Sequence, residues 1–214
     1  MYLPSHFAET RAPVLQALLR EHPLATLVTM GAGGLVADLV PLLFCPGAAP
    51  APDLLQGHVA RANPLWRDTD RCVEVLAVFQ GPQTYISPAW YPTKREHGKV
   101  VPTWNYVVVQ ARGRLHIRDD AAWVHDLVSR LTRIHEAGRP QPWAVDDAPP
   151  DYVHSMLAAV VGIEIEITSL VGKWKTSANQ PAANRAGVAQ ALAGQPGDDA
   201  ASMSRLVAAH DARN

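Results

Sequence analysis

The apolar runs of this chain are short, and most of them follow one another with no helical pattern between them. They lie at residues 24–29, 35–44, 54–60, 73–79, 84–87, 104–118 and 163–167. Proline and glycine separate many of them, and both residues commonly mark turns, bulges and strand ends. Parallel strands would need a crossover connection, usually helical, after each strand. The pattern therefore predicts a mainly β fold of six to seven antiparallel strands with peripheral helices.

Two of the runs carry more detailed expectations. The run at 73–79 is almost unbroken, which favours a strand buried on both faces, and Gly81 with Pro82 reads as the turn after it. In the run at 35–44, Pro41 points to an edge strand or a bulge because proline cannot donate a ladder hydrogen bond.

Helices are expected at the front and late in the chain. The first should end before Pro23, which disfavours helix at the preceding residue, and its apolar face is Val14, Leu15, Leu18 and Leu19. A later helix, capped by Asp119 or Asp120, has one apolar stripe formed by Trp123, Leu127, Leu131 and Ile134.

The last third of the chain is expected to continue with a second helix from near Asp147, with Tyr152, Met156 and Val160 on one face. A half-buried strand follows, in which Ile163, Ile165 and Ile167 point inward and the two intervening glutamates point outward. Residues 171–184 read as a basic, polar segment, and a short helix is expected at 186–193. We expect one domain over residues 1–194 and a tail over 195–214 that is either helical or disordered.

Composition narrows the function classes. Hydrophobic residues make up 48% of the chain, enough for a substantial core. The formal net charge is -1, which gives no general attraction to nucleic acid or to an anionic membrane. The two cysteines, Cys45 and Cys72, form neither a disulfide framework nor a zinc motif. With no targeting or membrane segment in the sequence, a cytoplasmic location is expected.

Two stretches contain side chains that suit a phosphate group. The first joins a strand to an expected helix and comprises His58, Val59, Ala60, Arg61 and Asn63. Arg61 and Asn63 can donate to phosphate oxygens, and the start of a following helix adds free N–H groups. In the second stretch Lys173, Lys175 and Ser177 share one face if the backbone is extended. Each stretch can also be read as an ordinary solvated strand end or basic loop.

Two other stretches suit a planar ligand. One carries Tyr85, Ser87, Trp90 and Tyr91, whose rings could flank such a ligand while a hydroxyl bonds its heteroatoms. In the other, Thr103 and Asn105 alternate with Trp104 and Tyr106, so that one strand face is polar and the other aromatic. The alternative readings are a loop whose rings cap the barrel and an ordinary strand start.

Several common signatures are missing from the sequence. There is no GxGxxG segment after a strand, no P-loop and no nucleophile elbow. His125 and His135 are ten residues apart on an expected helix, too far to share a metal ion. We therefore expect no metal site, and no catalytic residue can be assigned.

Taken together, these stretches resemble the PaiB-type family of FMN-binding negative transcriptional regulators. The matching segments follow the family's order and lie at residues 1–7, 22–28, 57–64, 81–91, 101–106 and 172–175. The resemblance implies an FMN-binding split β-barrel of Greek-key type, a homodimer, and a flavin held between the subunits by the residues named above. The chain departs from the family pattern at Asp38, Gln110, Arg112, Thr176 and Ala178.

Three functions follow from these observations. The first is an FMN-binding negative transcriptional regulator, acting directly or indirectly; the net charge gives direct DNA contact little support. The second is a flavin-dependent oxidoreductase or flavin reductase acting on a small molecule, with the flavin supplying the redox chemistry. The third is a split barrel whose ligand has been changed to haem or lost, which the departures motivate.

Overall fold

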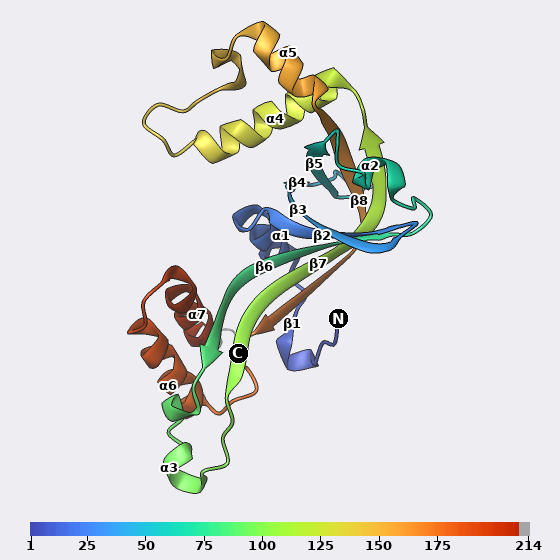
Figure 1. Ribbon diagram of the computed structural model, residues 1–214. Helices are drawn as coiled ribbons and strands as arrows, with labels where there is room; N and C mark the ends of the chain where they lie inside the picture. The colour runs from blue at the N-terminus through green and yellow to red at the C-terminus, as the bar shows by residue number, and fades with distance from the viewer. Residues whose placement is uncertain (210–214) are drawn as a thin grey trace. The chain divides into compact units, whose positions relative to one another are not determined.

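The computed structural model describes residues 1–209, which contain one eight-stranded sheet and seven α-helices (Figure 1). Its strands are β1 (Ala8–Glu9), β2 (Leu24–Gly31), β3 (Gly34–Pro41), β4 (Leu43–Cys45), β5 (Leu54–Ala60), β6 (Val75–Ile86), β7 (Thr103–Arg118) and β8 (Val160–Lys175). Its α-helices are α1 (Ala12–Glu21), α2 (Leu65–Asp68), α3 (Lys94–His97), α4 (Ala121–Glu136), α5 (Pro150–Ala158), α6 (Ala182–Ala193) and α7 (Asp198–Ala208). Short 3-10 turns occupy Ser5–Phe7, Pro88–Trp90 and Val145–Asp147.

The strands form one sheet in the order β3-β2-β6-β7-β8-β5-β4, and β1 pairs with β8. The pairings of β2 with β3 and β6, of β4 with β5, and of β8 with β1 and β5 are antiparallel. The mainly β, antiparallel fold class predicted from the sequence is confirmed. The sheet has eight strands rather than six to seven. Strand β1 is too short to recognise in the sequence, one predicted strand is divided in two, and two predicted strands are joined in β6.

The chain forms two compact units, and strands β6, β7 and β8 each contribute to both. The first unit, called the lysine unit here, comprises Met1–Leu18, Gln80–Val109 and the part of Val171–Asn214 that the structure describes. The second, called the insert unit, comprises Leu19–Phe79 and Gln110–Leu170. The predicted division at residue 194 stays a prediction; the expected tail carries α7, and residues 210–214 lie outside the described part.

Each unit buries its own apolar side chains. In the lysine unit, α6 packs against α7, and its buried side chains include Phe7, Leu15, Ile86, Val107, Val109, Val188, Leu192 and Met203. The core of the insert unit includes Leu27, Leu42, Leu55, Phe79, Leu127, Ile163 and Ile165. The α4 stripe predicted from the sequence is only partly buried, since Leu127 is fully buried whereas Ile134 is 54% exposed.

The helix boundaries depend on local signals that the sequence shows clearly. Helix α1 ends at Glu21, just before His22 and Pro23, as predicted. The Asp120 side chain accepts a hydrogen bond of 2.7 Å from the backbone N–H of Trp123 and so caps α4. Helix α5 begins at Pro150 rather than near Asp147, because residues 145–147 form a separate 3-10 turn.

The run at 35–44 was expected to be one strand, and this expectation is wrong. It forms β3 and β4, which lie at opposite ends of the sheet order. Pro41 ends β3, and the backbone N–H of Leu42 then donates to the carbonyl of Pro23 instead of continuing the strand. The edge position predicted from Pro41 is confirmed for β3.

Strand β6 corrects two further expectations. Gly81 and Pro82 lie inside it rather than in a turn, and residues 84–86 are its continuation rather than a new strand. A Cβ atom on Gly81 would lie 2.7 Å from a methyl group of Leu18, so this glycine allows close packing within the strand. The strand begins at Val75 and alternates buried with half-buried residues up to Phe79, so it is not buried on both faces.

Strand β8 extends much further than the sequence suggested. Residues 171–175, expected in a polar segment, are its last residues. Glu164, expected to face solvent, is buried because its carboxylate receives hydrogen bonds from Gln56 (2.6 Å) and Arg118 (2.6 Å). Local alternation could not predict this burial, since it depends on partners from distant parts of the chain.

Candidate functional site

Two lysines near the end of β8 form the centre of the candidate site, in the lysine unit. The ammonium groups of Lys173 and Lys175 lie 5.2 and 5.7 Å from the ring centre of Tyr106. Lys175 donates hydrogen bonds of 2.5 Å to the hydroxyl of Thr103 and 2.6 Å to the carbonyl of Trp104. Two lysines at positions i and i+2 therefore meet the same tyrosine, as the alternation along an extended strand predicts.

The electrostatics of this lysine cluster (Lys173, Lys175, Tyr106 and Thr103) favour an anion. Within residues 1–209, neither ammonium group has a carboxylate within ion-pair distance; Lys173 donates instead to the carbonyl of Tyr2 at 3.1 Å. Burial lowers the pKa of Lys175, Tyr106 opposes that shift, and the neighbouring Lys173 adds to it. Two close, partly desolvated cations would be stabilised by a multiply charged anion such as a phosphate.

A second polar contact joins Asn105, two residues after Thr103 in β7, to Ser177, two residues after the end of β8. Asn105 is buried, and its amide Nδ2 donates a hydrogen bond of 2.9 Å to the hydroxyl of Ser177. The other amide atom, Oδ1, is buried with no hydrogen-bond partner among the described residues. Since a buried acceptor is costly when unpaired, this oxygen suits a hydrogen-bond donor on a ligand.

A pocket of about 280 Å³ shares Tyr106 with the lysine cluster. Its walls carry aromatic rings, amides and aliphatic groups, from Gln80, Gly81, Gln83, Trp104, Tyr106, Val107 and Val108. Trp104 is 55% exposed and Tyr85 46% exposed, and their rings meet edge to face at 6.2 Å. Such walls can pack against a planar ring and hydrogen-bond its heteroatoms.

Three predicted site residues lie in the turn after β6. The Ser87 hydroxyl accepts a hydrogen bond of 3.2 Å from the backbone N–H of Ala89. Trp90 approaches α6 so closely that a Cβ on Gly187 would lie 2.3 Å from its carbonyl oxygen. Tyr91 is buried, and burial raises the pKa of its hydroxyl. Of the three side chains, only that of Ser87 makes a hydrogen bond within this turn, which lies wholly in the described part of the chain.

The predicted phosphate-binding residues Arg61 and Asn63 belong to the insert unit. The guanidinium of Arg61 donates to both carboxylate oxygens of Asp119, at 2.6 and 3.0 Å, and to the carbonyls of Ala158 and Val160. Asn63 donates to Asp38 at 2.9 Å and accepts from the backbone N–H of Leu65. Helix α2, whose start was expected to supply free N–H groups, has only four residues.

The three residues before them lie at the end of β5. Val59 is buried and Ala60 is exposed at the last position of the strand. His58 lines an apolar pocket beside α4 and α5, where its Nδ1 atom is buried. Because these residues and the lysine cluster lie in different units, their meeting around one phosphate remains a prediction.

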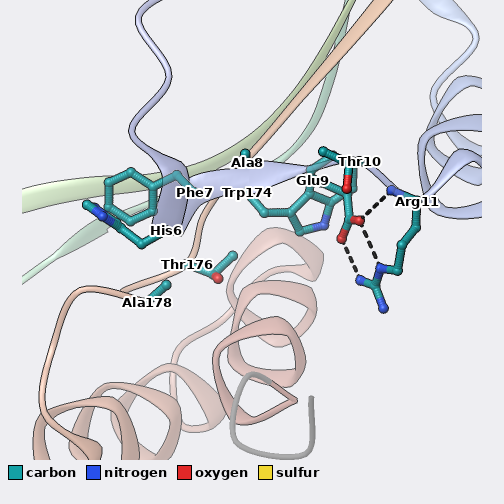
Figure 2. A pocket seen from close by; sticks show the side chains of 9 residues that line it. All are labelled: His6, Phe7, Ala8, Glu9, Thr10, Arg11, Trp174, Thr176 and Ala178. Atoms are coloured by element: carbon teal, nitrogen blue, oxygen red, sulfur yellow. Dashed lines mark hydrogen bonds and ion pairs between the residues drawn. The ribbon is translucent and has the colours of Figure 1, made fainter. Parts of the chain in front are cut away.

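Sequence reasoning missed a pocket on the lysine unit, of about 310 Å³ (Figure 2). Its lining residues come from the N-terminal segment and the end of β8: His6, Phe7, Ala8, Glu9, Thr10, Arg11, Trp174, Thr176 and Ala178. The Glu9 carboxylate is buried and bonded to the Arg11 guanidinium. If the alternation along β8 is extended beyond residue 171, it places Trp174, Thr176 and Ala178 on one face.

The described part of the chain supports neither a metal site nor a membrane-spanning helix. Residues 1–209 contain no cluster of three or more histidine, cysteine, aspartate or glutamate side chains that could hold a metal ion. None of the helices in the same range is both long and apolar enough to cross a bilayer.

The antiparallel sheet and its peripheral helices define a split-barrel protein of the flavin-binding fold class. Three solved structures are similar to it at TM-scores above 0.5 and low sequence identity. The flavocytochrome Anf3 from Azotobacter vinelandii gives a TM-score of 0.53 at 16% identity, over 78% of this chain and 69% of that one. An FAD and heme binding protein from Mycobacterium smegmatis gives a TM-score of 0.54 at 16% identity, over 78% of this chain and 73% of that one. The conserved hypothetical protein Rv2991 from Mycobacterium tuberculosis gives a TM-score of 0.56 at 12% identity, over 85% of this chain and 94% of that one.

The chain belongs to the family described as "Putative FMN-binding domain", whose model matches residues 1–169. It is 31% identical to the "Protease synthase and sporulation protein PAI 2" of Bacillus subtilis, over 97% of this chain and 96% of that protein. It is 32% identical to an uncharacterized protein of Aspergillus fumigatus, over 88% and 89% of the two chains. The resemblance to the PaiB-type family that the sequence motifs suggested is confirmed.

Proposed function

We propose that this chain binds FMN and that Lys173 and Lys175 hold its phosphate. The observation that carries the proposal is the pair of ammonium groups beside Tyr106, with no carboxylate partner within the described residues. A phosphate would supply the negative charge that this partly buried pair lacks. Family membership supports FMN as the flavin, although the family match ends at residue 169, before both lysines.

The neighbouring groups fit the rest of the flavin. Trp104 and Tyr106 line the 280 Å³ pocket and offer flat apolar surfaces to a ring system, and Gln80 and Gln83 offer amides. Asn105 Oδ1 is a buried acceptor for a hydroxyl or ring N–H. Bound FMN would supply redox chemistry. The contributions of Tyr85, Ser87, Trp90, Tyr91 and residues 58–63 remain predictions from the sequence.

The lysine assignment is tested by comparing FMN with riboflavin, which has the same ring and ribityl chain but no phosphate. A Lys173→Met, Lys175→Met double variant should lose about 10- to 150-fold in FMN affinity for each charged hydrogen bond removed. Its riboflavin affinity should stay near that of the parent protein. Lys99→Met changes an exposed lysine of the same unit and serves as the control.

Two results would overturn the assignment. One is an equal loss for both ligands, because the lysines would then matter for folding or for the ring rather than for the phosphate. The other is an unchanged FMN affinity in the double variant. The absorbance spectrum of the purified protein separates flavin from haem or no ligand, and so tests the alternative of a changed ligand.

We also propose that the working form is a homodimer. The β2–β3 hairpin exposes large apolar side chains: Leu24 is 57% exposed, Leu35 72%, Val36 48% and Leu39 68%. Strand β3 is also an end strand of the sheet order, which leaves one of its edges available for pairing. A second copy of the chain would cover this surface. A Leu35→Glu, Leu39→Glu double variant should sediment as a monomer, whereas Lys99→Met should not change the assembly.

For the biological role we propose negative regulation of transcription that acts through the flavin-bound protein rather than through DNA contact. The resemblance of the sequence motifs to the PaiB-type family of negative transcriptional regulators supports a regulatory role, and the net charge of -1 gives little attraction to DNA. A gel-shift titration at several salt concentrations tests this: the proposal expects no shift. A shift that weakens steeply with salt would show direct binding. A cytoplasmic location remains a prediction from the sequence.

The second candidate is a flavin-dependent oxidoreductase, which the pocket beside Tyr106 favours. The pocket combines aromatic and amide walls, which suit a second small molecule stacked against a flavin as well as the flavin itself. Steady oxidation of NADH or NADPH by the flavin-loaded protein would support this function. Lack of turnover with common electron acceptors would favour the regulator.

A further inference from the structure

Helix α5 has a clear apolar side, yet none of its residues is buried. Val153 and Leu157 are half-buried, while Tyr152 and Met156 are 57% and 46% exposed. The sequence pattern predicts Tyr152, Met156 and Val160 on one face of this helix, but α5 ends before Val160, which begins β8. Tyr152 and Met156 line a pocket of about 220 Å³ rather than pack fully into the core.

The pocket lies within the insert unit, where α4 and α5 are neighbours (Figure 1). Helix α4 contributes Val128 and Thr132 to its walls, and the segment between the helices contributes Trp143, Val145 and Ala148. His58 and Val160 come from the strands β5 and β8. The lining contains no aspartate, glutamate, lysine or arginine side chain, so the pocket favours an uncharged molecule.

His58 gives this pocket a specific polar group. Its ring lines the pocket, and neither ring nitrogen has a hydrogen-bond partner among the described residues. Burial also lowers the pKa of the ring, which keeps the imidazole neutral at physiological pH. A neutral ring nitrogen can donate or accept one hydrogen bond, so an unpaired ring nitrogen suits a ligand group that can do either, such as a hydroxyl.

The volume limits the size of the ligand. An apolar cavity of about 150 Å³ is large enough for benzene in an engineered protein. A space of about 220 Å³ therefore holds one substituted ring. We propose that this pocket binds an uncharged single-ring aromatic molecule with one hydroxyl group, which hydrogen-bonds to His58. The residues that line the pocket all belong to the insert unit, and the proposal does not depend on the assignment of the lysines to the FMN phosphate.

Phenol and toluene provide a matched pair of probes, because they have nearly the same shape but only phenol carries a hydroxyl. The experiment uses the full chain with its natural ligand retained, and measures saturable binding by titration calorimetry or ligand-observed NMR. Phenol should bind about tenfold more tightly than toluene, the effect of one hydrogen bond to the ring nitrogen.

Three variants locate the binding site. His58→Leu should remove the preference for phenol while keeping toluene binding. Ala148→Phe should fill the pocket and weaken both probes at least tenfold. His154→Leu is the matched control, because His154 is an exposed residue of α5 that does not line the pocket. Circular dichroism of each variant shows whether it is folded.

Three results would overturn the proposal. They are equal affinities of phenol and toluene for the parent protein, an unchanged phenol preference in His58→Leu, and unchanged binding of both probes in folded Ala148→Phe. Release of bound flavin by phenol is a fourth such result, because the pocket would then be part of the flavin site. The FMN and riboflavin comparison fails or succeeds independently of these outcomes.

Discussion

The side-chain amide of Asn105 donates a hydrogen bond of 2.9 Å to the hydroxyl of Ser177, 72 residues further along the chain. Both side chains are buried, so replacing either by alanine leaves the other without this partner. Asn105→Ala and Ser177→Ala should each lower the free energy of unfolding by about 1–3 kcal/mol.

The double variant tests whether the contact itself is the cause. Because both single changes break the same hydrogen bond, the double variant should lose less than the sum of the two. Urea denaturation of the four proteins measures this. Strictly additive losses would show that the two side chains act independently.

Gly113 lies in β7 close to the backbone of β8. A Cβ atom there would lie 2.3 Å from the backbone carbonyl oxygen of Glu166, and backbone cannot move aside as a flexible side chain can. Gly113→Ala should therefore lower the free energy of unfolding by about 1–3 kcal/mol or more. Gly138→Ala is the control, because nothing lies within 4 Å of its Cβ position. Equal stability of the two variants would contradict this account.

Glu164 should make the free energy of unfolding depend on pH in the acidic range. Burial alone would raise the pKa of its carboxyl, but hydrogen bonds from Arg118 and Gln56 outweigh burial and hold the pKa below its ordinary value of 4.5. Below pH 4.5 the unfolded chain takes up this proton before the folded chain does, so stability falls as the pH falls. The advantage of the parent protein over Glu164→Gln should be constant above this pH and shrink below it. Urea midpoints across the pH range test this, and an unchanged difference would contradict it.

His58 should produce a second pH dependence in a higher window. Burial lowers the pKa of its ring below the ordinary 6.5, so the unfolded chain gains this proton first as the pH falls. The free energy of unfolding should therefore begin to decrease below pH 6.5, and His58→Gln should remove that part of the decrease. NMR titration of the His58 ring proton, identified by its loss in His58→Gln, should show a midpoint below 6.5. A midpoint at or above that value would show that the ring is well solvated.

Patterns within a single element predicted several features correctly. Alternation gave the polar and aromatic faces at the start of β7, and it placed Lys173 and Lys175 on one face of an extended segment. The positions of proline correctly predicted the end of α1 and the edge position of β3. Each of these features depends on backbone geometry over a few residues, which the local sequence determines.

The features that the sequence did not reveal depend on distant partners. Glu164 is buried because Gln56 and Arg118 satisfy its carboxylate. Gly81 and Pro82 remain in a strand because α1 packs closely against that position. The apolar face of α5 looked like an ordinary core face, since its pattern gives no sign of the space beneath it. Long-range packing determines each of these features, and local periodicity in the sequence carries no information about such packing.

The passage of β6, β7 and β8 through both compact units has a consequence for how such a gene can change. Each unit is encoded by separated stretches of the coding sequence, so a single recombination breakpoint cannot exchange one unit whole between relatives. Variation should therefore accumulate through point substitutions and through insertions at connections such as the one between α4 and α5. A library of chimaeras built from this family should yield folded proteins mainly when the exchanged blocks carry all the segments of one unit together.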